Sequence, residues 1–185
     1  MSQPMTEWRG RVGMCCVIAA EAAIFTIFVV AYLFYRGKSL SGPTPADVLQ
    51  LPVLPTLCLL SSSLTIHAGV KALTKGNVRG FARWWLLTVA LGAAFLTGTA
   101  LEWHRLIYMD GLTIQANLFG TTYFSLVGLH AFHVTVGLAG LTLGSLLALR
   151  GHVRPSHASR SDVFSLYWHF VDGVWIVVLL VVYVV

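Results

Sequence analysis

Five long apolar segments alternate with short polar connections along the chain. They cover residues 13–35, 54–73, 84–103, 118–149 and 163–185. A helix needs about 20 apolar residues to cross the hydrocarbon core of a bilayer, and each segment has roughly that length. Because lipid offers no hydrogen-bond partners to the backbone, a spanning segment of this kind must be helical. The pattern predicts an all-α bundle of five transmembrane helices, forming a single transmembrane domain over residues 1–185.

The composition excludes a soluble domain. Hydrophobic residues make up 57% of the 185 and charged residues only 10%, whereas soluble domains carry about 25% charged residues. A soluble fold of this length cannot bury so much apolar surface. The net charge of +5 does not indicate nucleic acid binding, because the basic residues cluster in the connections between apolar segments.

The Lys and Arg residues are divided unequally between the two ends of the predicted helices. Nine of the 12 lie on the side of the N-terminus: Arg9, Arg11, Lys71, Lys75, Arg79, Arg83, Arg150, Arg154 and Arg160. The opposite side has Arg36, Lys38 and Arg105. Since cytoplasmic connections are enriched in basic residues, the N-terminus is predicted to be cytoplasmic and the C-terminus outside.

The three cysteines, Cys15, Cys16 and Cys58, all fall within apolar segments. Their spacing matches neither a zinc site nor the disulfide framework of a small secreted protein. We therefore predict that they are small buried residues.

Two glutamates fall within or at the end of apolar segments. An ionisable side chain inside a membrane helix is costly, so each is a functional hypothesis. Glu21 lies about 12 Å from the inner end of the first segment, and no Lys or Arg shares its helix at that depth. Its partner is expected to be another helix, water or a proton of its own, and a packing role is the alternative. Glu102 ends the third segment.

The fourth segment carries a regular stripe of histidine and glycine. The spacings of 3, 4, 3 and 4 place these residues on one helix face: His130, His133, Gly137, Gly140 and Gly144. Glycine lets a neighbouring backbone approach closely in a membrane. The stripe predicts a tight helix contact in the inner half and two imidazoles in the outer half.

The fifth segment places His169 and Asp172 one helical turn apart. An ionised aspartate is costly at this depth, and an imidazole one turn away is well placed to share its proton. Trp168 and Trp175, seven residues apart, share a face and are predicted to pack against other helices.

A metal site is the alternative interpretation of these groups. Imidazole and carboxylate are ligands for non-haem iron, and imidazole also binds haem; the candidates are Glu21, Glu102, His130, His133, His169 and Asp172. However, two histidines three residues apart are a weak signal, and no glutamate precedes either one at di-iron spacing. The sequence shows no nucleophile–base pair and no phosphate-binding loop. We predict no metal site and no catalytic residue on this chain.

Several short sequence motifs resemble those of subunit III of haem–copper oxidases, in the short bacterial form with five helices rather than seven. The motifs are Gly13–Met14 with Glu21, Pro55 with residues 61–63, Leu101–Glu102–Trp103, residues 120–124, Gly128 to His130, His133–Val134, residues 167–172 and Val174–Trp175. Together they extend over nearly the whole chain.

This resemblance implies a non-catalytic subunit that stabilises subunit I, binds phospholipid in a V-shaped cleft and supports proton uptake. Haem and copper are then expected on partner subunits, with subunit II and other respiratory subunits nearby in a bacterial inner membrane. The resemblance matches Glu21 to the family's carbodiimide-reactive glutamate. It also matches Glu102, the His130–His133 and His169–Asp172 pairs, and, more loosely, His157 on the approach to the last helix.

Two other functions remain open at this point. Accessory subunits of nitric oxide reductases are similar to this family and also short, and a stand-alone membrane metalloenzyme is the third hypothesis. The resemblance leaves both cytochrome c and quinol open as electron donors.

Overall fold

The computed structural model describes residues 3–39 and 42–184, and the regular elements in this part of the chain are all helical. They are α1 (Gln3–Tyr35), α2 (Pro45–Val48), α3 (Val53–Thr74), α4 (Val78–Tyr108), α5 (Leu118–Leu149), the 3-10 turn η1 (Pro155–His157), α6 (Ala158–Leu179) and the π-helical end η2 (Leu180–Val184). Within the described residues, five helical segments are long and apolar enough to cross a membrane. The predicted all-α bundle of five transmembrane helices is confirmed.

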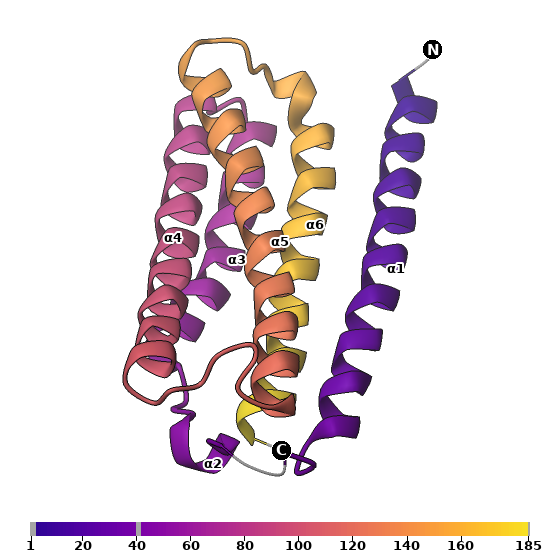
Figure 1. Cartoon of the computed structure of the whole chain (residues 1–185). Coiled ribbons are helices and arrows are strands. Elements are labelled where there is room, and N and C mark those ends of the chain that lie inside the picture. Colours follow the sequence, from indigo (N-terminus) through magenta and orange to yellow (C-terminus); the bar gives the residue numbers. More distant parts are fainter. Residues whose placement is uncertain (1–2, 40–41, 185) are drawn as a thin grey trace.

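Four of the long helices form a bundle, and α1 stands at its side (Figure 1). The largest contact joins α3 and α4, while α5 packs against α4 and α6 packs against α3 and α5. Helix α1 contacts α5 and α6 and diverges from them toward its N-terminal end (Figure 1). That end of α1 lies at the same end of the molecule as the α3–α4 turn and the connection from α5 to α6 (Figure 1). The basic connections therefore share one end of the molecule, as the predicted topology requires.

Side-chain caps and glycine turns set the ends of the long helices. Asn77 accepts a hydrogen bond from the Gly80 amide (2.7 Å), and α4 therefore begins before the apolar segment 84–103. Asn117 caps α5 in the same way. Gly76 and Gly151 have φ angles of 80° and 76°, and both follow a helix end, where the left-handed backbone favours glycine.

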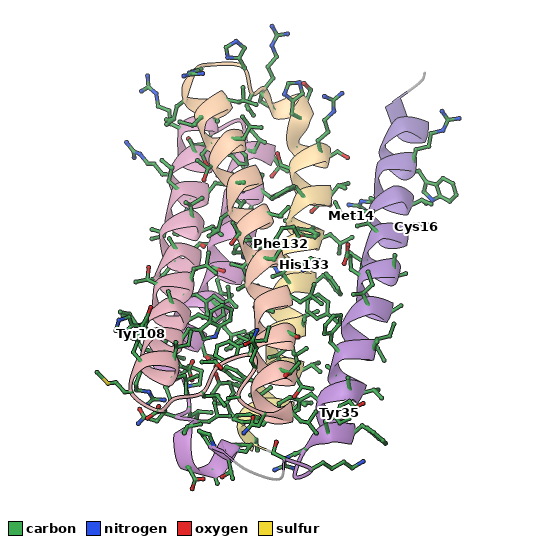
Figure 2. The ribbon with its side chains drawn as sticks, viewed as in Figure 1. Met14, Cys16, Tyr35, Tyr108, Phe132 and His133 are labelled. Atoms are coloured by element: carbon green, nitrogen blue, oxygen red, sulfur yellow. The ribbon has the colours of Figure 1, made fainter. Side chains whose placement is uncertain are left out.

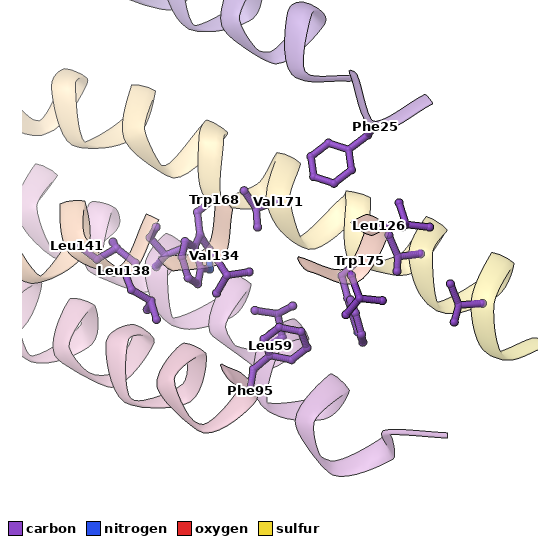
Figure 3. Close-up of a cluster of buried hydrophobic side chains, with 14 of the residues drawn as sticks. Phe25, Leu59, Phe95, Leu126, Val134, Leu138, Leu141, Trp168, Val171 and Trp175 are labelled. Carbon is purple, nitrogen blue, oxygen red and sulfur yellow. The ribbon is translucent and has the colours of Figure 1, made fainter. Parts of the chain in front are cut away.

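Two tryptophans of α6 fill the centre of the bundle (Figure 3). Trp168 donates from Nε1 to Ser62 Oγ (2.8 Å), and Trp175 donates to Thr56 Oγ1 (3.1 Å). Each ring thus buries a large apolar area while its polar N–H finds a partner. Both contacts join α6 to α3.

The glycine stripe of α5 is filled by aromatic rings. A Cβ atom added there would lie 2.7 Å from Trp168 at Gly137, 2.5 Å from Phe164 at Gly140 and 2.6 Å from Trp85 at Gly144. These rings come from α6 and α4. The close helix contact expected from the stripe is therefore a contact with aromatic side chains and not an approach of two backbones.

The predicted burial of the cysteines is wrong for Cys15 and Cys16, which are exposed on α1 (Figure 2 labels Cys16). The physical reason is that α1 packs on one side only, so most of its circumference faces away from the bundle. Cys58 on α3 is partly buried.

Candidate functional site

A hydrogen bond between Glu21 and His133 joins α1 to α5. Oε2 of Glu21 lies 2.9 Å from Nε2 of His133, and Nδ1 of the same ring lies 2.7 Å from the carbonyl oxygen of Leu129. The His133 side chain is 8% exposed and the Glu21 side chain 27% exposed. The ring of Phe25 packs 5.0 Å from the imidazole. The predicted partner of Glu21 from another helix is thus a histidine.

The contacts of His133 fix the number of protons that the pair shares. A carbonyl oxygen only accepts hydrogen bonds, so Nδ1 of His133 carries a hydrogen and donates it to Leu129. The contact between Nε2 and Glu21 then needs one further proton. Either a protonated Glu21 donates to a neutral imidazole, or an imidazolium donates to a carboxylate. The pair is neutral overall in both states, which suits a site without Lys or Arg.

An apolar groove runs along α1 and α6 beside this pair. Its volume is about 370 Å³, and its walls are formed by Ala22, Phe25, Thr26, Val29, Phe170, Gly173, Val174, Val177 and Val178. Ala22 follows Glu21 directly in the sequence. The other groove residues of α1 lie farther from the N-terminus than Ala22. Glu21 therefore lies at the end of the groove nearer the start of α1. Tyr167 supports the α5 side of the site by donating to the backbone oxygen of His133 (3.3 Å).

His130, one turn from His133, lies in a different environment. It is fully buried, and neither ring nitrogen has a hydrogen-bond partner among the described residues. Its ring stacks on Trp175 with the centroids 5.1 Å apart and meets the edge of Phe95 at 5.6 Å. The two predicted imidazoles therefore do not form one site: His133 faces α1, while His130 packs among aromatic rings of α4 and α6.

A second polar contact joins α3 to α6. The hydroxyl of Ser63 is hydrogen bonded to Oδ2 of Asp172, and it also lies 3.0 Å from Nδ1 of His169. His169 and Asp172 are thus linked through a serine of another helix. Reasoning from the sequence paired the two side chains but missed Ser63, because the run Ser61 to Ser63 does not reveal which hydroxyl reaches Asp172 and His169.

Glu102 belongs to a third contact, between α4 and the end of the chain. Tyr183 donates to its carboxyl group (3.1 Å to each oxygen) and lies 3.3 Å from the hydroxyl of Tyr123. His157 lies apart from all three contacts, in η1, where its Nδ1 accepts from the Arg154 amide (3.3 Å). Within residues 3–39 and 42–184, no three His, Cys, Asp or Glu side chains gather in a way that would hold a metal ion.

These features define a class of protein: a multi-pass helical membrane protein whose interior acids are paired with imidazole and hydroxyl groups of other helices. The family model for cytochrome c oxidase subunit III matches residues 9–185. A cytochrome c oxidase subunit 3 of Synechocystis is 39% identical over a compared length of 179 residues, with 92% of this chain and 73% of the relative covered. Proteins of the same name from Corynebacterium diphtheriae and Thermostichus vulcanus are 35% and 33% identical, with 93% of this chain covered in both and 86% and 85% of the relatives.

The chain belongs to the cytochrome c oxidase subunit III family. It is therefore a subunit of a haem–copper oxidase, an oxidoreductase made of several chains.

Proposed function

We propose that the chain has three roles in its oxidase: it stabilises subunit I, holds phospholipid along α1, and supports proton uptake through the Glu21–His133 pair. The observation that carries this proposal is the 2.9 Å contact of these side chains beside an apolar groove. The pair holds one exchangeable proton inside the membrane without a net charge. Transfer of that proton between Glu21 and His133 needs no rearrangement of the helices, because both positions of the proton keep the hydrogen bond.

The groove supports the lipid part of this proposal. All of its lining residues are apolar except Thr26, whose hydroxyl donates to the backbone oxygen of Ala22 (2.7 Å). An extended acyl chain matches such walls, because it offers no polar group that would need a partner. Since the groove lies between α1 and α6, a bound acyl chain would fill space between α1 and the rest of the bundle.

We further propose the placement of the subunit in a bacterial cytoplasmic membrane, with the start of α1 on the cytoplasmic side. The end of the molecule that carries the start of α1 also carries most of the basic residues, which supports this orientation. Subunit I is the proposed main partner, with subunit II and other respiratory subunits beside it. The redox centres would lie on those partners.

Purification with an affinity tag on this chain tests the assignment of partners. In mild detergent, an oxygen-reducing subunit with haem and copper should co-purify with the tagged chain. Co-purification of a nitric oxide reductase in its place, without oxygen-reducing activity, would contradict the proposal.

A further inference from the structure

The three consecutive serines of α3 differ in what their hydroxyl groups contact. Ser61 donates to the backbone oxygen of Cys58 (2.9 Å), and Ser62 donates to that of Leu59 (2.5 Å). A serine hydroxyl in a membrane helix usually donates to a backbone oxygen of the preceding turn in this way. The Ser63 hydroxyl instead lies between Asp172 and His169 of α6. Because Ser63 occupies the middle of the 22-residue helix, this contact is near the centre of the membrane.

The surroundings of Asp172 favour a protonated carboxyl group. The residue is 4% exposed, and its Oδ1 atom has no hydrogen-bond partner in the part of the chain that the structure describes. An ionised carboxylate with an unpaired oxygen at this depth is costly. A neutral acid that donates from Oδ2 to the Ser63 oxygen leaves only a carbonyl oxygen unpaired, which costs less.

A serine hydroxyl has one hydrogen, so Ser63 can donate to only one of its two partners, and the other contact needs a donor from the partner. When Asp172 donates to Ser63, the Ser63 hydrogen is free to point at Nδ1 of His169, which then must be unprotonated. When Asp172 is ionised, Ser63 donates to the carboxylate, and Nδ1 of His169 must supply the hydrogen for the second contact. The position of the hydrogen on His169 therefore depends on the protonation of Asp172.

We infer that Ser63, His169 and Asp172 form a proton relay, in which the serine hydroxyl passes one proton between the carboxyl and the imidazole. In the transfer, the O–H bond of Asp172 breaks as a bond from that proton to Ser63 Oγ forms. The original Ser63 O–H bond breaks as the Nδ1–H bond of His169 forms. A neutral acid and a neutral imidazole thus become a carboxylate and an imidazolium, with Ser63 unchanged.

The relay meets the surface of the molecule at His169. This side chain is half-buried, and His67 on α3 and Asp162 on α6 lie close enough to act on it electrostatically. His67 is exposed, and Asp162 pairs with Arg11 of α1 at 2.5 Å. His169 is therefore the more exposed end of the relay, and Asp172 is its buried end. The relay lies between α3 and α6 and does not use Glu21, so it goes beyond the proposed function.

Two spectroscopic titrations of the intact oxidase test the relay. Infrared difference spectra between the natural protein and Asp172→Asn report the carboxylic acid band of Asp172. Nitrogen-15 NMR, with the signal of His169 assigned through His169→Asn, reports which ring nitrogen carries hydrogen. As the pH rises, the loss of the acid band and the move of hydrogen from Nε2 to Nδ1 should share one midpoint.

Ser63→Ala should abolish this coupling, so that His169 no longer follows Asp172. The matched control Ser61→Ala, whose hydroxyl serves its own helix, should leave the shared midpoint in place. The relay is wrong if Asp172→Asn removes no acid band, if the two midpoints differ in the natural protein, or if Ser63→Ala keeps them equal. Should Ser63→Ala fail to assemble, the shared midpoint of the natural protein and of Ser63→Thr, which keeps the hydroxyl, decides the question.

Discussion

His133 of α5 holds Glu21 of α1 at 2.9 Å while its other ring nitrogen is tied to the backbone of Leu129. The backbone bond selects the nitrogen that faces α1, and the pair therefore shares one proton. The contact also has a mechanical consequence, since α1 packs against the bundle through α5 and α6 only lightly compared with the contact of α3 with α4. A polar bond within such a limited interface contributes to holding the helix in place.

Removal of the imidazole should loosen α1. His133→Ala leaves the carboxyl group of Glu21 without its hydrogen-bond partner, and an unsatisfied buried polar group costs about 1–3 kcal/mol. The temperature at which this subunit dissociates from the oxidase should fall. His152→Ala, which changes an exposed histidine of the α5–η1 connection, is the control and should leave that temperature unchanged. An unaltered dissociation temperature in His133→Ala would show that the contact does not stabilise the subunit.

The glycine stripe should tolerate no side chain at Gly137. An alanine Cβ would lie 2.7 Å from the ring of Trp168, which is fully buried and bonded to Ser62. Overpacking of this kind costs about 1–3 kcal/mol, more than the gain of about 1 kcal/mol from replacing a helical glycine. Gly13→Ala is the matched control, because a Cβ there meets nothing within 4 Å. Thermal unfolding should show Gly137→Ala to be the less stable variant; equal stability would contradict the packing of the stripe.

The lipid proposal can be tested by filling the groove. Gly173 lines it, and an added Cβ there meets no protein atom within 4 Å. Gly173→Leu should therefore displace lipid without disturbing the bundle, and native mass spectrometry should find fewer phospholipids on the oxidase. Gly13→Leu, on α1 but outside the groove, should keep the natural number. Equal lipid content in the two variants would mean that the groove does not hold the bound lipid.

The sequence was sufficient for the helices but not for all of their contacts. Length and hydropathy predicted five membrane helices, because the bilayer imposes both properties directly on the sequence. The sequence spacing correctly placed His130 and His133 near one face of α5. It did not show that the two rings point toward different neighbours. Their 3-residue spacing turns them about 60° apart, enough for one to face α1 and the other the aromatic core.

Contacts between helices depend on rotations that no single segment encodes. Ser63 shares its residue type with the two residues before it, and only the packing of α3 on α6 distinguishes it from Ser61 and Ser62. Likewise, the exposure of Cys15 and Cys16 follows from the position of α1 beside the bundle, whereas an apolar segment by itself suggested burial.

Replacement of Glu21 by glutamine is the most direct measurement of the central claim. The glutamine amide still donates to Nε2 of His133, so assembly should survive, while the exchangeable proton of the pair is lost. In the reconstituted oxidase, the Glu21→Gln variant should inactivate after fewer turnovers than the natural protein, with a lower rate of proton uptake. Glu102→Gln, which alters the separate contact with Tyr183, should leave both quantities unchanged. Proton uptake and inactivation of Glu21→Gln equal to those of the natural protein would contradict the account and leave the pair a packing contact.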